Sequence, residues 1–69
     1  MSAYTPSQLG NLAVLEASAF CREAGLRLVS RSVLWLLDVS NQGASLEVSF
    51  SATDRLELGT STYQRRIAL

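Results

Sequence analysis

The nucleophilic side chains of this chain are one cysteine, Cys21, and ten serines. A serine nucleophile needs a neighbouring base such as His or Lys, and the sequence contains neither. A Cys21 thiolate stabilised by Arg22 would be reactive, but a small buried side chain is the simpler interpretation of a lone cysteine within a helical pattern. We therefore predict that the chain is not an enzyme.

Residues that could hold a metal or a cofactor are equally scarce. One cysteine without histidine cannot complete a structural zinc site, and no glycine-rich phosphate-binding loop is present. Glu47 and Glu57 could face each other across a hairpin, yet both occupy polar positions that are typical of a solvated sheet surface. We expect no cofactor and no metal.

The basic side chains are all arginines, and six of them balance six acids to a formal net charge of +0. This balance lacks the electrostatic footprint of a non-specific nucleic-acid binder. Arg27, Arg31, Arg65 and Arg66 could still form a local patch that contacts phosphates or an acidic protein surface, with Tyr63 as an aromatic contact. Solubilising charge and protection of a strand edge are the simpler interpretation.

The clearest element is a helix that begins after Thr5 and runs to about Ala24. Thr5 can be the N-cap, Pro6 suits the first helical position, and Gln8 completes a capping box. Gly25 is suited to a left-handed C-cap. The predicted buried stripe consists mostly of small residues, namely Leu9, Ala13, Ala17, Phe20 and Ala24, with Cys21 beside them.

After Gly25 the pattern changes to the period of two that is typical of strands. The predicted strands cover 26–30, 33–39, 46–52 and 56–58, and 63–69 is either a final strand or a loose tail. Residues 32–40 could instead form a short buried helix, but they lack a helix cap and we prefer a strand. Residues 1–69 are thus expected to form a single α+β domain, with one N-terminal helix packed on a three- to four-stranded antiparallel sheet.

The longest wholly apolar run, residues 33–37, is far shorter than the roughly 20 residues that span a bilayer. The N-terminus has no basic segment followed by an apolar one, as a signal peptide would. We therefore expect a soluble protein that is cytoplasmic, or carried inside a particle made in the cytoplasm, and that does not contact membranes.

Apolar residues occupy both sides of the strand expected at 33–39. Trp35 is expected in the core, together with the other odd-numbered residues of this strand. Leu34 and Leu36 point to the other side, joined by Leu26 and Leu28. One helix can cover only one face of a sheet, so these leucines should drive self-association, and a symmetric homodimer is the commonest result. Leu12 and Leu15 of the helix, which fall outside its buried stripe, offer a second contact.

These observations favour a small non-catalytic protein-binding module, such as an adaptor, an inhibitor or an assembly component. Its size would suit a phage or mobile-element protein, for example an inhibitor of a host defence complex such as an anti-CRISPR. The partner would be another protein, including a second copy, and the expected contact residues are Leu34, Leu36, Arg27, Arg31, Tyr63, Arg65 and Arg66. The alternative is a small nucleic-acid-binding regulator that uses the arginines.

Overall fold

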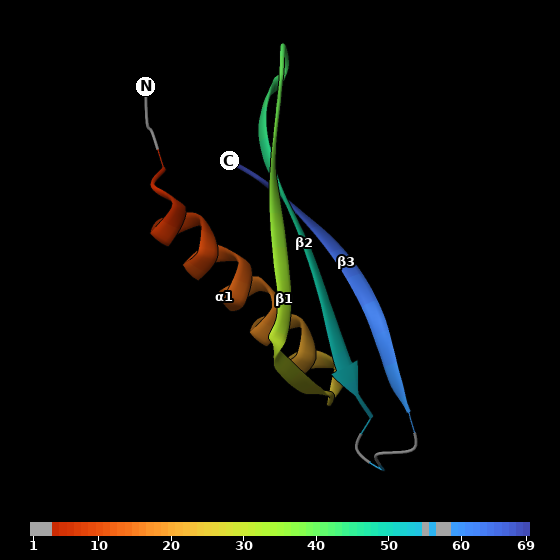
Figure 1. Cartoon of the computed structure of the whole chain (residues 1–69). Helices are drawn as coiled ribbons and strands as arrows, with labels where there is room; N and C mark the ends of the chain where they lie inside the picture. Colours follow the sequence, from red (N-terminus) through yellow and green to blue (C-terminus); the bar gives the residue numbers. More distant parts are fainter. Residues whose placement is uncertain (1–3, 55, 57–58) are drawn as a thin grey trace.

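A computed structural model describes residues 4–54, 56 and 59–69 and has one helix packed against a three-stranded antiparallel sheet (Figure 1). The elements are α1 (Pro6–Ala24), β1 (Arg27–Ser40), β2 (Gly43–Thr53) and β3 (Thr60–Ala68), and the strand order is β1-β2-β3. The α+β architecture and the strand at 32–40 are confirmed. Of the strand predicted at 56–58, Leu56 lies in a turn, and residues 57 and 58 lie outside the described part of the chain.

Both ends of α1 form as their sequences predict. The Thr5 Oγ1 accepts the Gln8 N–H at 3.2 Å, and the Gln8 Oε1 accepts the Thr5 N–H at 2.9 Å, which completes the capping box. Gly25 ends the helix with φ 71°, in the left-handed conformation that glycine adopts without strain, and its N–H donates to the Cys21 carbonyl.

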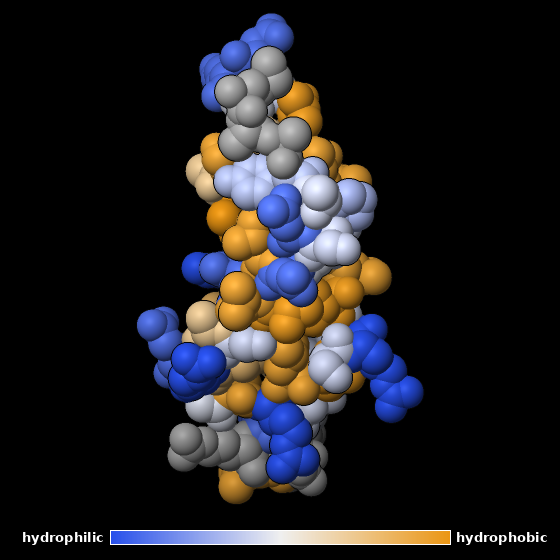
Figure 2. All heavy atoms as spheres, turned by 90° about the vertical axis from the view of Figure 1, so that its left-hand side faces the viewer, coloured by the Kyte–Doolittle hydropathy of each residue, from blue (hydrophilic) through white to orange (hydrophobic). Residues whose placement is uncertain are grey.

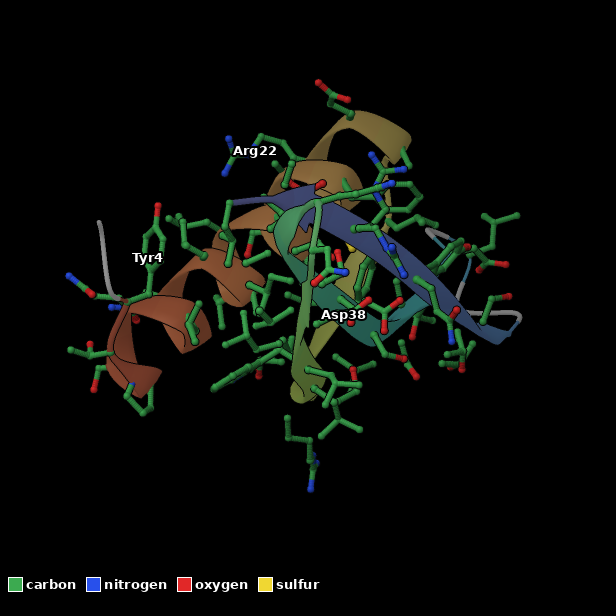
Figure 3. All side chains as sticks on the ribbon, turned by 90° about the horizontal axis from the view of Figure 1, so that it is seen from above. Tyr4, Arg22 and Asp38 are labelled. Carbon is green, nitrogen blue, oxygen red and sulfur yellow. The ribbon has the colours of Figure 1, made fainter. Side chains whose placement is uncertain are left out.

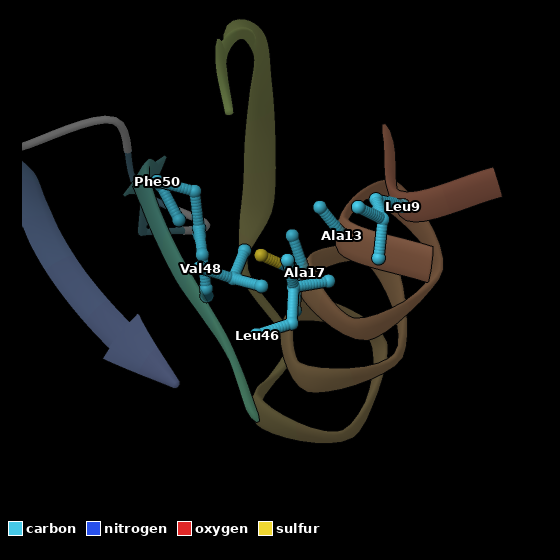
Figure 4. Packing of buried hydrophobic residues seen from close by; sticks show 8 residues of the cluster. Leu9, Ala13, Ala17, Leu46, Val48 and Phe50 are labelled. Atoms are coloured by element: carbon cyan, nitrogen blue, oxygen red, sulfur yellow. The ribbon is translucent and has the colours of Figure 1, made fainter. Parts of the chain in front are cut away.

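The core is the contact between α1 and the central strand β2 (Figure 4). The buried residues of the helix are Leu9, Ala13, Ala17 and Cys21, and those of β2 are Leu46, Val48, Phe50 and Ala52. The two alanines let the helix backbone approach the larger side chains of the strand. Ala24, which we expected to extend this stripe, is exposed because it lies in the last turn before the chain leaves the helix.

A large bulge divides β1 into two parts. Val29 pairs with Ser51 and Leu34 pairs with Ser49, so residues 30–33 lie opposite Phe50 alone. The Ser32 side chain bridges the gap, since its Oγ accepts the Ser51 N–H at 2.8 Å and donates to the Val29 carbonyl.

This bulge changes which residues of β1 face the helix. Even-numbered residues face the helix before the bulge, and odd-numbered residues face it after the bulge. Leu28 pairs with Ala52 and Trp35 pairs with Val48, so both face the helix. Leu26 and Leu28 are partly buried against the core. The expectation that they join Leu34 and Leu36 on the other face is therefore wrong.

One face of the sheet has no covering element among the described residues. Seen from above, α1 lies on one side of the strands, with Tyr4 at its start and Asp38 on the projecting part of β1 (Figure 3). We call the face away from α1 the outer face. On β2 and β3 it carries mainly hydroxyl, amide and charged side chains, including two close pairs, Ser51 with Thr62 and Thr53 with Thr60.

Replacement of Thr5 by Ala tests the N-cap. The change removes the acceptor for the Gln8 N–H and should lower the free energy of unfolding by about 0.5–2 kcal/mol. Chemical denaturation measures this loss, and Ser7→Ala, in the same helical turn, is the matched control that should change it by less than about 0.5 kcal/mol. Equal midpoints for the two variants would contradict the capping role.

Replacement of Ser32 by Ala tests the bulge. It leaves the partly buried Ser51 N–H without its acceptor, which should cost about 1–3 kcal/mol of unfolding free energy. Ser30→Ala removes the same atom from an exposed serine in the bulge and serves as the control in the same denaturation experiment. If Ser32→Ala and Ser30→Ala were equally mild, the hydroxyl would not be holding the bulge.

Candidate interaction surface

The largest exposed apolar side chains of the sheet lie together on one strand. We define the β1 edge as residues 33–39 of β1. Its exposed members are Leu34 (68%), Trp35 (37%), Leu36 (63%), Leu37 (41%) and Val39 (70%). A side chain of this size normally lies inside a protein or at an interface, so five within six consecutive positions of one strand form an unusual surface.

The β1 edge is apolar on both faces of the sheet. Trp35, Leu37 and Val39 pair with Val48, Leu46 and Ala44 and point to the helix side. Leu34 and Leu36 pair with Ser49 and Glu47 and point to the outer face. The edge thus presents apolar groups above and below the strand, whereas the outer face of β2 and β3 is polar.

The helix covers only the beginning of this edge. A Cβ placed on Gly10 would lie 3.6 Å from the Trp35 Nε1, so the indole packs beside the first turns of α1. The turn end of the hairpin of β1 and β2 extends past the helix (Figure 1). Leu37 and Val39 therefore remain exposed although they face the helix side. We expected Trp35 within the core, but it lies at the margin of the core.

Backbone groups at this edge also lack a strand partner among the described residues, because β1 is an outer strand of the sheet. The Ala44 carbonyl accepts the Leu69 N–H at 3.0 Å, so Ala44 directs its backbone groups away from β1. Its partner Val39 is consequently in a non-hydrogen-bonded pair, and by alternation Trp35 and Leu37 are too. These three residues direct their N–H and C=O groups outward, where a further strand could bind.

A shallow hollow adjoins the β1 edge on the outer face. Its lining includes Leu34 and Leu36, followed by Glu47, Ser49, Gln64 and Arg66 from the neighbouring strands. Arg66 donates a hydrogen bond to Glu47 and lies 3.9 Å from Asp38. The apolar surface therefore ends against a group of paired charges.

The four arginines that we considered as one basic patch are not gathered on one face. Arg65 lies on the helix side, where its Nε is 3.3 Å from Glu16 Oε1 and its guanidinium is 5.2 Å from the centre of the Phe20 ring. Arg66 faces the opposite way, Arg27 pairs with Thr53 at the other end of β1, and Arg31 lies in the bulge. Arg65 and Arg66 thus pair with acids on opposite faces of the sheet, and Arg27 and Arg31 lie elsewhere on β1.

Tyr63 contributes to packing around Phe20. Its ring centre is 5.1 Å from that of Phe20 and 5.7 Å from that of Phe50, and the residue is partly buried against the core.

Leu12 also packs against the core, which leaves Leu15 as the exposed leucine of α1. From the helix side, apolar side chains form a band along the molecule (Figure 2).

Sequence reasoning found Leu34 and Leu36 but missed the rest of the β1 edge. It assumed that a helix covers the whole inner face, whereas Leu37 and Val39 lie beyond its reach. The bulge was missed as well, although the consecutive polar residues Ser30, Arg31 and Ser32 interrupt the alternation and could have indicated it.

Cys21 faces the core from α1 and is 3% exposed. Burial raises the pKa of its thiol, which favours the neutral form over the thiolate. Arg22 projects away from the sheet, so it does not share the surroundings of the thiol (Figure 3). These features are those of a structural cysteine rather than a nucleophile.

No protein-family model, no curated protein and no solved structure matches this chain. Within the described ranges, no helix has the length and apolar character needed to cross a bilayer. The same part of the chain contains no cluster of three or more metal-binding side chains.

Alkylation kinetics test the state of Cys21. The folded protein should react with iodoacetamide about tenfold or more slowly than the urea-unfolded chain at the same pH, because the thiol is buried and neutral. Mass spectrometry over time measures both rates. Equal rates would mean that the thiol is accessible in the folded protein and would reopen a nucleophilic role.

Proposed function

We propose that this chain is a non-catalytic protein-binding module whose binding surface is the β1 edge. The observation that carries the proposal is the coincidence of exposed apolar side chains with outward-facing backbone groups on one outer strand. Either feature alone is common. Together they match strand addition, in which backbone hydrogen bonds supply affinity and alternate side chains supply specificity.

The composition of the edge supports a binding role. Soluble proteins usually protect an outer strand with Lys, Pro or a charged side chain that prevents pairing. Residues 33–39 contain no Lys and no Pro, and their charged residue, Asp38, comes near the end of the run. A strand left this apolar needs a partner to exclude water from it.

The energy available at this surface is sufficient for a specific complex. Leu34 and Leu36 are each about two-thirds exposed, so burying them would contribute about 1–2 kcal/mol apiece. Trp35, Leu37 and Val39 add further apolar area, and strand pairing adds backbone hydrogen bonds. These contributions together can exceed the entropic cost of association.

The expectation of a nucleic-acid-binding regulator receives no comparable support. Arg65 and Arg66 have acidic partners, and the arginines are spread over both faces. Trp35, the most exposed aromatic side chain of the sheet, lies among leucines rather than beside arginines. Inhibition of a host defence complex remains a prediction about the identity of the protein partner.

A paired capture experiment tests the proposal. Leu36→Asp places a charge at the centre of the exposed run and should reduce recovery of a specific partner from host extract by about tenfold or more. Quantitative mass spectrometry compares this variant with the wild-type chain. Because Leu36 is 63% exposed, the variant should keep its far-UV circular dichroism and most of its stability.

The matched control is Ser61→Asp, which adds the same charge on the outer strand at the opposite edge. Partners that bind the β1 edge should be retained by Ser61→Asp and lost from Leu36→Asp. A differently tagged copy of the chain is included in the extract, so that self-binding is also scored. A partner set, this copy included, that is unchanged by Leu36→Asp, or lost equally from both variants, would refute the β1 edge as the binding surface.

A further inference from the structure

We infer that the partner at the β1 edge is a second copy of the chain, paired with it antiparallel about a two-fold axis at Trp35. This inference rests on the proposed function, which it completes by naming the partner. The two three-stranded sheets would become one continuous sheet across the axis.

The run of apolar residues is nearly symmetric about Trp35. In an antiparallel pair centred there, Leu34 of each copy lies opposite Leu36 of the other, and Leu37 lies opposite Val33. Directly opposed residues share a face, so all four outer-face leucines would form one cluster. Leu34 and Leu36 are the exposed leucines of the outer face of β1, and this single register covers both of them.

The charges at the two ends of the run select the antiparallel direction. Arg31 precedes the apolar residues and Asp38 follows them. In this register Arg31 of each copy lies opposite Val39 of the other, one position from Asp38, so antiparallel pairing brings opposite charges to the same end of the ladder. Parallel pairing would instead place like charges side by side. Both side chains are exposed, and the Asp38 carboxylate, which lies 3.9 Å from Arg66 of its own chain, can also be approached by Arg31 of the other copy.

The backbone suits the same register. Trp35 and Leu37 direct their N–H and C=O groups outward, so the pair of Trp35 with Trp35 would be hydrogen-bonded, and Leu37 would direct the same groups toward Val33, the last residue of the bulge, in the other copy. The bulge at residues 30–33 ends regular pairing on one side. The ladder is therefore about five residues long, the usual length of a short strand pair.

The axis would place both helices on the same face of the joined sheet. Because α1 contacts both β1 and β2, and strands lie about 4.8 Å apart, two copies of α1 would pass about 10 Å from each other. Gly10 lies beside Trp35, and Val14, one turn along the same side of α1, is 46% exposed. The small and apolar residues on this side of the helix permit such an approach.

Stacking of two outer faces is a less suitable arrangement. It would bury Ser49, Gln64, and the paired Glu47 and Arg66, all of which would lose solvent contacts. Edge pairing buries the apolar residues on both sides of β1 and leaves these polar groups in water.

Charge reversal tests self-pairing by sedimentation velocity. The wild-type chain should move from a 7.5 kDa species at low concentration towards twice that mass at micromolar concentration. Arg31→Glu and Asp38→Arg should each weaken the dimer about tenfold at low salt, because each variant places like charges together at both ends of the run. Mixing the two variants should restore affinity to within about threefold of wild type, because every pair is then opposite in sign.

The two variants carry opposite net charges, so the control is a mixture of Arg22→Glu and Glu23→Arg, which make the same charge changes on the exposed end of α1. Rescue that exceeds this control shows that positions 31 and 38 act together across copies. A wild-type chain that stays at 7.5 kDa, or a mixture as weak as its components, would overturn the inference. Far-UV circular dichroism confirms that each variant is folded. If the wild type is monomeric while Leu36→Asp still loses another protein, self-pairing is wrong and the proposed function stands.

Cysteine crosslinking tests the register. In a Cys21→Ser background, a mixture of Leu34→Cys and Leu36→Cys should form a disulfide between the two variants faster than either forms one with itself. A mixture of Leu34→Cys and Ser61→Cys is the control and should remain uncrosslinked. Preferential crosslinking of Leu34→Cys with itself would show a different register and contradict the axis at Trp35.

Discussion

Ala13 and Ala17 let α1 lie close against Leu46, Val48 and Phe50 of the central strand, and the rest of the surface is arranged around this contact. The helix packs against β1 and β2, where it buries the inner face of β2 but only the first part of the inner face of β1. β3 compensates with Tyr63 and Ile67, which pack against the core, and with Arg65 paired to Glu16. The outward half of β1 has no comparable cover, so its apolar residues remain exposed.

The bulge lets a single strand serve two purposes. Before the bulge, the even-numbered Leu28 points toward the helix and contacts the core. After the bulge, odd-numbered residues point toward the helix, and Trp35 is one of them. Without this change, Leu28 and Trp35 could not both face the helix, and one of them would be exposed on the outer face. The Ser32 hydroxyl accepts the Ser51 N–H at the bulge, so this partly buried donor keeps a hydrogen-bond partner there.

The sequence predicted the parts of the fold that depend on local chemistry. Thr5, Gln8 and Gly25 mark the helix ends because capping involves residues three or four positions apart, and strand alternation likewise depends on near neighbours. The reach of α1 along the sheet depends on its crossing angle, which no local pattern encodes, so Leu37 and Val39 were assigned to the covered face. The dispersal of the four arginines follows from strand register and the bulge, and these also depend on distant parts of the chain.

Electrostatics leave association at the β1 edge unopposed. Six arginines and six acids cancel, so copies of the chain carry no net charge that would repel each other at neutral pH. Soluble monomers with exposed apolar strands usually depend on such repulsion or on charged residues within the edge. Here Arg66 lies near both Glu47 and Asp38 and offsets part of their negative charge beside the leucines. The local charges can therefore set the direction and register of pairing, while the apolar side chains and the outward backbone groups supply its strength.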